Sequence, residues 1–214
     1  MLVPRILGLV SELMQSRKPF ICLTDSARRD SLCATLEVAP HGDMWVFGYG
    51  SLMWNPEFSY VERRVGTLVG YRRRLCVLSS RARGTAENPG LGLGLEPAEG
   101  ECWGIAYRLD LAMLDKDLNA LWDREMTTGI YQPHWLPVTT VEGEVTAIAF
   151  VVDRNHRQYA GNLSQDEMVA LIVSASGHYG PCHEYLANTV RELTALGINE
   201  PGFDTLLARV NAQG

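Results

Sequence analysis

Glu125 is a carboxylate whose place in the sequence suits proton transfer. Leucines at helical spacing predict a helix over residues 111–126, and at about 100° per residue Glu125 falls in the middle of its apolar stripe. A carboxylate on such a face is either paired or desolvated, and desolvation raises its pKa, so that it accepts protons more readily near neutrality. The plainer alternatives are an ion pair with Arg124 and a frayed helix end that exposes the side chain to water. The helical wheel does not decide between them.

A turn bracketed by glycines is the second feature that could take part in chemistry. Residues 44–47 are an apolar run suited to a strand buried on both faces, and the run ends at Gly48 and Gly50 before Ser51. Glycines let the backbone approach a ligand because no Cβ blocks the way. Successive amides in such a turn can form a nest for a carboxylate or phosphate. A tight turn without any ligand is the plainer interpretation, and local composition alone favours it.

The same turn suggests two other kinds of site, and Met53 argues against both. The elbow of a serine hydrolase needs a glycine two residues after the nucleophile, and that position after Ser51 is Met53. A dinucleotide fingerprint that starts at Gly48 needs its third glycine at the same place, and no βαβ unit follows. Both interpretations are therefore weak.

Bulk composition limits the classes of protein and partner. The sequence has 214 residues, a formal net charge of −6, 46% hydrophobic residues and 21% charged residues, which is ordinary for a globular chain with a sizeable core. The negative charge argues against nucleic acid or an anionic membrane as the main partner. No apolar run approaches the ~18 residues of a membrane span, and the N-terminus lacks the features of a secretory signal. We therefore expect a cytoplasmic protein.

Cysteine and histidine spacing predicts neither a disulfide framework nor a metal site. The five cysteines are scattered without a CxxC pair, and His178 and His183 are five residues apart, which puts them on different sides of any helix. Proton transfer by a carboxylate needs no cofactor, so we expect none. The sequence assigns no oligomeric state.

A cluster of arginines follows the turn. Arg72, Arg73 and Arg74 lie in a strand-compatible stretch, and Arg81 and Arg83 come soon after it. Most charge runs form a solvated face, here of a strand pair, and this is the plainer interpretation. The functional alternative is that one or two of these guanidinium groups bind a substrate carboxylate.

The remaining patterns predict the elements that must position these residues. Amphipathic spacing predicts a helix over residues 5–16, and residues 40–43 indicate a linker, so we expect a helical extension over residues 1–43 and the main domain over residues 44–214. Strands and helices without regular alternation favour an α+β fold, a mixed sheet or small β-barrel flanked by helices. The expected strands are 65–78, 91–95, 102–109 and two within 138–152, and the expected helices are 164–176 after a capping box of Ser164 and Glu167, 182–196 before Gly197, and 203–210.

Six short segments, in order along the chain, carry a resemblance to a known family. They are Phe47–Pro56 (FGYGSLMWNP), Arg83–Gly84, Pro89–Gly90, Trp103–Leu109 (WGIAYRL), Trp122–Met126 (WDREM) and Gly129–Tyr131 (GIY). Together they resemble the ChaC family, the glutathione-specific γ-glutamylcyclotransferases. The resemblance runs from about Trp45 to Leu196 and covers most of the chain. Met126 stands where some members have lysine, which puts nothing essential in doubt.

The resemblance implies a fold, an activity and roles for individual residues. The family fold is a small mixed β-barrel with helices around it, and its members cleave glutathione to 5-oxoproline and cysteinyl-glycine. The family's catalytic glutamate falls on Glu125, and the tyrosine that lines the pocket in the wider superfamily falls on Tyr131. The substrate-binding turn falls on Tyr49, Gly50, Ser51, Leu52, Met53 and Trp54. The alternatives are cyclotransfer on other γ-glutamyl amino acids or amines, and a non-catalytic module that binds γ-glutamyl compounds.

Overall fold

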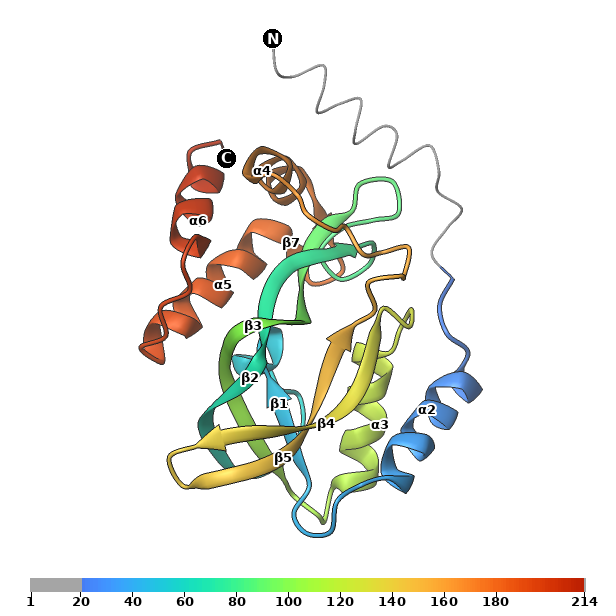
Figure 1. Ribbon diagram of the computed structural model, residues 1–214. Helices are drawn as coiled ribbons and strands as arrows, with labels where there is room; N and C mark the ends of the chain where they lie inside the picture. Colours follow the sequence, from blue (N-terminus) through green and yellow to red (C-terminus); the bar gives the residue numbers. More distant parts are fainter. Residues whose placement is uncertain (1–20, 214) are drawn as a thin grey trace.

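A closed five-stranded β-barrel forms the centre of the computed structural model, which describes residues 21–213 (Figure 1). The strands neighbour one another in the order β1-β3-β2-β4-β5, and parallel pairing of β1 with β5 closes the ring. Parallel and antiparallel pairs both occur, so the expected mixed barrel is confirmed. The strands are β1 (Trp45–Gly48), β2 (Tyr60–Ser79), β3 (Gly90–Leu109), β4 (Tyr131–Thr140) and β5 (Gly143–Val152).

Two groups of helices flank the barrel, as expected (Figure 1). One group pairs α2 (Asp25–Glu37) with α3 (Leu114–Glu125). The other group packs α4 (Gln165–Ser174), α5 (Cys182–Ala195) and α6 (Phe203–Asn211) against one another. None of the helices within residues 21–213 is long and apolar enough to cross a membrane. The short elements are the 3₁₀ helix η1 (Ser51–Met53) and the two-stranded sheet of β6 (Ser176–Gly177) and β7 (Gly180–Pro181).

Local sequence signals set the ends of two helices as predicted. The Ser164 hydroxyl accepts a hydrogen bond from the Glu167 amide at 3.3 Å, and the Glu167 carboxylate accepts one from the Ser164 amide at 2.7 Å, which forms the capping box of α4. Gly197, with φ of +70°, follows α5 and takes the left-handed conformation that other residues adopt at a cost.

The hydrophobic core lies on both faces of β1. Phe47 packs in a cluster that the barrel shares with α4, α5 and α6, whereas Val46 packs in a second cluster with Trp122 of α3 and Phe150 of β5. All of β1 is buried, which confirms the strand predicted from the apolar run. Because both faces of this short strand are packed, the turn that follows it has a fixed starting point.

One expected pair of strands is wrong, one helix was not expected, and one expected helix is not described. The two strands expected at 91–95 and 102–109 are one strand, β3, which pairs along β2 with three register shifts, one of them at the polar stretch around Gly100. The helix α2 was not predicted, because only Leu32 and Thr35 of it are buried and no apolar stripe marks it. The helix predicted over residues 5–16 lies outside the described residues.

Candidate active site

Two adjoining cavities lie where the C-terminal end of α3 meets the turn after β1. The outer cavity has a volume of about 310 Å³, and the inner cavity, against the turn, has about 30 Å³. The outer volume is at the lower end of the roughly 300–1,000 Å³ range of ligand sites. The side chains that line both cavities are Ser51, Glu125, Tyr131 and Tyr185, and they come from four different elements or their ends.

Glu125, the last residue of α3, directs a largely desolvated carboxylate at these cavities. Its side chain is 14% exposed, and burial raises its pKa above the ordinary carboxyl value. The Arg124 guanidinium lowers that pKa and the nearby Glu57 carboxylate raises it, but burial is the largest influence. The carboxylate is thus both desolvated and paired, since Arg124 Nε lies 3.5 Å from Glu125 Oε1, and desolvation is the larger influence on the pKa. A frayed end that exposes the side chain to water is not found, because α3 continues to Glu125.

Arg124 forms its hydrogen bonds with the turn and the residues just after it rather than with Glu125. Its Nη1 donates to the Asn55 carbonyl at 2.7 Å and to the Glu57 carboxylate at 3.0 Å, and its Nη2 donates to the Ser51 hydroxyl at 2.9 Å. A guanidinium group has a fixed fork of donors, so these contacts fix its plane. Arg124 thus ties the end of α3 to the turn and leaves the Glu125 carboxylate only a long contact.

The turn presents backbone amides at the start of η1. No hydrogen bond from the Ser51 or Leu52 amide is found within residues 21–213, as is usual for the first amides of a helix. Close packing explains the glycine at position 48, because a Cβ there would meet the Leu52 Cβ at 3.0 Å. The turn can therefore offer amides to an anionic group, in the way its sequence predicted.

The buried Tyr49 and Tyr185 and the half-buried Tyr131 surround the inner cavity. Tyr49 donates its hydroxyl hydrogen bond to the Phe150 carbonyl at 2.7 Å, and Tyr131 donates to the Leu93 carbonyl at 2.6 Å. The Tyr185 hydroxyl instead accepts from the Leu93 amide at 3.3 Å. Burial raises the pKa of all three hydroxyls, so they stay protonated and neutral around Glu125.

Residues 44–213 match the family described as ChaC-like protein. This chain belongs to the ChaC-like family. Among relatives, it is 42% identical over 185 residues to the glutathione-specific γ-glutamylcyclotransferase of Escherichia coli K12, across 86% of this chain and 80% of that protein. It is 30% identical over 168 residues to the enzyme of the same name from Schizosaccharomyces pombe, across 70% and 82% of the two chains.

Solved structures show the same fold. The ChaC-like chain superposes on the crystal structure of a yeast γ-glutamylcyclotransferase specific to glutathione with a TM-score of 0.72, covering 80% of this chain and 97% of that one. Their sequence identity is 21%, so this likeness concerns the fold alone. The helix-flanked barrel that the resemblance implied is thus found both in the coordinates and in a neighbouring structure.

The ChaC-like structure brings together all but one of the site residues predicted from sequence. Glu125, Tyr131 and the turn residues line the cavities, and Trp54 lines the outer one. Met53 lines neither cavity: it is 2% exposed, packs in the core, and its carbonyl accepts a hydrogen bond from Tyr107 at 2.9 Å. Within the described residues, no group of three or more His, Cys, Asp or Glu is arranged to hold a metal ion. The turn residues that line the inner cavity are Tyr49, Gly50, Ser51 and Leu52.

Two site residues were missed or underestimated from sequence. Tyr185 lies on the buried face of α5 with Cys182 and Leu186, so its spacing predicts an ordinary core residue. Arg124 was considered only as a partner of Glu125, although it mainly binds the turn. Sequence spacing alone does not distinguish Tyr185 from a core residue, because its distinguishing feature is that its side chain lines the inner cavity.

The arginine cluster divides between structure and site. Arg73 is 3% exposed and Arg74 pairs with the buried Glu96 at 3.0 Å, so a solvated face is the wrong interpretation for these two. Arg81 and Arg83 line the outer cavity, where they supply positive charge. A substrate carboxylate can therefore be met only by the second part of the cluster.

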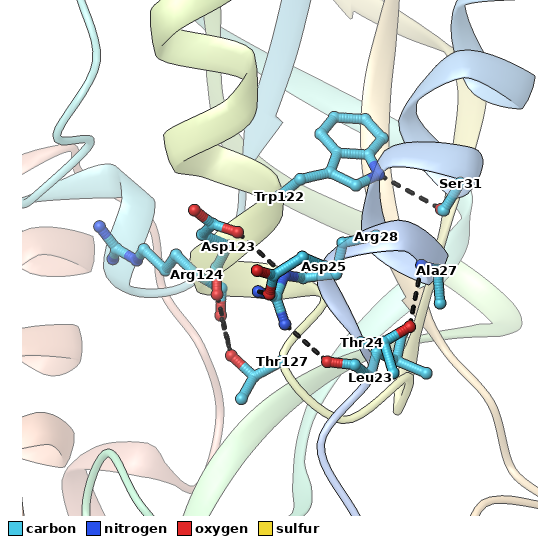
Figure 2. A network of polar contacts seen from close by, with 10 residues as sticks. All are labelled: Leu23, Thr24, Asp25, Ala27, Arg28, Ser31, Trp122, Asp123, Arg124 and Thr127. Carbon is cyan, nitrogen blue, oxygen red and sulfur yellow. Dashed lines mark hydrogen bonds and ion pairs between the residues drawn. The ribbon is translucent and has the colours of Figure 1, made fainter.

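The helix α2 and the residues just before it brace the end of α3 (Figure 2). Arg28 of α2 donates to the Asp123 carboxylate at 2.9 Å and to the Leu23 carbonyl at 2.7 Å. The Leu23 amide donates to the Thr127 carbonyl at 2.9 Å, just after α3 ends. Glu125 lies between Asp123 and Thr127, so these contacts fix both sides of the catalytic candidate.

Proposed function

We propose that this ChaC-like protein is a γ-glutamylcyclotransferase that cleaves glutathione to 5-oxoproline and cysteinyl-glycine, with Glu125 as general base and general acid. One observation carries the proposal: the Glu125 carboxylate, whose pKa is raised by burial, lines the same small cavity as Gly50 and Ser51. The 42% identity with a bacterial enzyme named for glutathione supports the choice of substrate.

The reaction needs an unprotonated amine and a protonated leaving group. The α-amine of the γ-glutamyl group attacks its own γ-carbonyl carbon, but an amine with a pKa of about 8 is mostly protonated at neutral pH. Glu125 accepts a proton from this amine as the new C–N bond forms. When the old amide bond breaks, Glu125 returns a proton to the nitrogen of cysteinyl-glycine. One carboxylate thus serves both halves, and no water is consumed.

Positioning supplies most of the remaining rate enhancement. Because the attack is intramolecular, the enzyme gains by holding the γ-glutamyl group in a ring-like conformation. The amides of Ser51 and Leu52 are placed to bind its α-carboxylate, and Tyr131 forms part of the wall. The arginines of the outer cavity, Arg81 and Arg83, give a cationic surface to a substrate with a net negative charge.

Replacing Glu125 by glutamine tests the proposal. We expect E125Q to bind glutathione, measured by calorimetry, and to form no detectable 5-oxoproline, because an amide cannot accept the proton of the amine. The matched control is E37Q, which makes the same change at the exposed end of α2 and should keep wild-type turnover. Full 5-oxoproline formation by E125Q would remove the proposal.

Two narrower alternatives are separated by the choice of substrate. Purified protein incubated with glutathione and with γ-glutamyl-alanine should release 5-oxoproline from glutathione at a much higher rate. Equal rates would favour a cyclotransferase for γ-glutamyl compounds in general. Binding of both compounds without any 5-oxoproline would favour a non-catalytic module on the same scaffold.

The division of the chain and its location complete the proposal. Residues 44–214 form the catalytic domain and residues 1–43 an extension that contributes α2 to the support of α3. A cytoplasmic location is supported by the five cysteines, all of which are free thiols. Neither nucleic acid nor a membrane surface is part of the proposed function.

A further inference from the structure

The Tyr185 hydroxyl lies at the wall of the inner cavity, between the turn and β3. It accepts a hydrogen bond from the Leu93 amide at 3.3 Å, and a Cβ built on Gly50 would come within 3.4 Å of it. Tyr185 and Glu125 line both cavities, so a molecule that reaches Glu125 also passes this hydroxyl. Glycine at position 50 keeps the space beside the hydroxyl open.

The proton of the Tyr185 hydroxyl is free to bind a ligand. The hydroxyls of Tyr49 and Tyr131 are donated to the carbonyls of Phe150 and Leu93. The Tyr185 oxygen is itself an acceptor, and no hydrogen bond donated by this hydroxyl is found within residues 21–213. An incoming N–H bond polarises a hydroxyl and strengthens it as a donor.

The ring of Tyr185 is held on several sides. Its centroid is 5.7 Å from that of Trp54 in an edge-on contact, and the Arg83 guanidinium lies 5.6 Å above the ring. Burial raises the pKa of this hydroxyl above that of an ordinary phenol, so the hydroxyl keeps its proton at neutral pH. A fixed, neutral donor aimed into a desolvated cavity is the arrangement that stabilises developing negative charge.

We propose that the Tyr185 hydroxyl donates a hydrogen bond to the γ-carbonyl oxygen of the substrate and is a further catalytic residue; this inference rests on the proposed function. As the α-amine nitrogen bonds to the γ-carbon, the carbonyl π electrons move to oxygen, and the oxyanion accepts the bond from Tyr185. When the carbonyl reforms, the amide C–N bond breaks and the nitrogen of cysteinyl-glycine takes the proton from Glu125. Tyr185 keeps its proton throughout.

The substitution Y185F separates stabilisation of the oxyanion from substrate binding. We expect kcat to fall about 100-fold, the usual effect of losing one oxyanion donor, with KM changed less than about threefold. The matched control is Y60F, which removes a phenol hydroxyl from the exposed Tyr60 on the barrel surface and should leave kcat and KM unchanged. A raised KM with an unchanged kcat, or wild-type values of both, would overturn the inference.

Fluorinated tyrosines at position 185 separate catalysis from a structural role. Each added fluorine lowers the pKa of the phenol, and the resulting phenolate can still accept the Leu93 hydrogen bond but can no longer donate. We expect kcat to fall on the alkaline side of the pH profile, at a pH that moves lower with each fluorine. A profile that does not move would contradict the inference, and this test holds even if Y185F folds poorly.

Different results would contradict the proposed function and the role of Tyr185. Wild-type protein that forms no 5-oxoproline from glutathione would remove the proposed function and this inference with it. Wild-type activity together with a loss of activity in E125Q, but not in Y185F, would remove only the role of Tyr185.

Discussion

The charge of Glu125 is set by burial, which raises its pKa, and by Arg124, which lowers it. The structure resolves this competition through the geometry of Arg124, whose strong hydrogen bonds go to Ser51 and Asn55. If Arg124 gave its short hydrogen bonds to Glu125 instead, the closer ion pair would favour the ionised carboxylate and make it a poor proton donor in the second half of the reaction. Diverting the guanidinium to the turn leaves Glu125 able to act in both directions.

Glu125 should make the protein less stable as the pH rises. Because its pKa in the folded state lies above the ordinary 4.5, the folded protein binds more protons at this site than the unfolded chain does between those two values. The free energy of unfolding therefore falls as the pH rises through that window. We expect E125Q to have a higher Tm than wild type near neutral pH, and the difference to shrink as the pH falls toward 4.5.

Circular dichroism melts across the pH range check this expectation. Other carboxylates titrate in both proteins, so the difference between the two curves isolates Glu125. A difference in Tm that stays constant with pH would mean that ionisation of Glu125 is not linked to folding.

At the scale of single residues, the sequence predicted the surroundings of Glu125 better than those of Met53 and Tyr185. Helical periodicity placed Glu125 on an apolar face, and the structure finds it largely buried there. Met53 was assigned to the site through the family resemblance, but in the 3₁₀ helix η1 successive side chains point about 120° apart, and that of Met53 packs in the core. Tyr185 has the spacing of a core residue, and only the fold shows that its hydroxyl ends in a cavity.

The pair of helices α2 and α3 is the element on which the position of Glu125 depends. Arg28 forms the main polar link, with contacts to Asp123 at 2.9 Å, to Asp25 at 2.6 Å and to the Leu23 carbonyl (Figure 2). The aspartates are exposed and Arg28 is 18% exposed, so each ion pair adds little by itself, while the carbonyl contact adds a charged hydrogen bond.

We expect R28A to lower the free energy of unfolding by ~1–2 kcal/mol, because it removes these links together. The matched control is R29A at the neighbouring exposed position, which should change stability by less than ~0.5 kcal/mol. Urea denaturation of both variants measures the difference. Equal stability of R28A and R29A would show that the polar contacts of Arg28 do not contribute measurably to the packing of α2 on α3.

The elements that the sequence pattern predicted well are those with local signals. The capping box at Ser164 and the glycine at position 197 mark helix ends in a few residues, and both were found where expected. In contrast, β3 continues through Pro97 and Gly100 because β2 pairs with it on either side of the irregularity. That continuity depends on a partner strand, which no local window contains.

On the scale of the whole molecule, Arg73 joins the barrel, the turn and the C-terminal helices. Its Nη1 donates to the Tyr49 carbonyl at 2.6 Å, its Nη2 donates to the Trp103 carbonyl, and its Nε lies 2.7 Å from the Glu200 carboxylate between α5 and α6. The Arg73 side chain is fully buried, so its removal would take a donor from the buried Tyr49 carbonyl and from the part-buried Trp103 carbonyl, and a charge partner from Glu200.

We expect R73M to lower the free energy of unfolding by ~3 kcal/mol, since the buried Tyr49 carbonyl and the part-buried Trp103 carbonyl would each lose a charged donor. R72M is the matched control: it makes the same change at the exposed neighbour and should cost less than ~0.5 kcal/mol. Midpoints of urea unfolding at constant slope measure both. Similar midpoints for the two variants would show that the Arg73 contacts are not part of what stabilises the barrel.

The alternation of side chains along β2 predicts that Arg73 is buried, whereas the run of three arginines suggested a solvated face. In a strand, side chains two apart share a face, so Arg73 must point the same way as Leu75, which is buried. A run of three charged residues indicates a solvated segment only where it is not a strand. The partner of Arg73, however, is 127 residues away in sequence, and only the closed fold brings Glu200 to it.

The order of pairing in the barrel has a consequence for a chain still being synthesised. The strand before the turn, β1, pairs with β3 and with β5, and Val46 lies opposite Tyr107 on one side and Ile148 on the other. Both partner strands are synthesised after β1. Glu125 precedes β5 in the chain, but β1 and the turn after it gain their second partner strand only once β5 has been synthesised. We therefore expect a nascent chain that stops before β5 to carry Glu125 and the turn without cleaving glutathione, because the ring of strands is still open and Tyr185 has not yet been added.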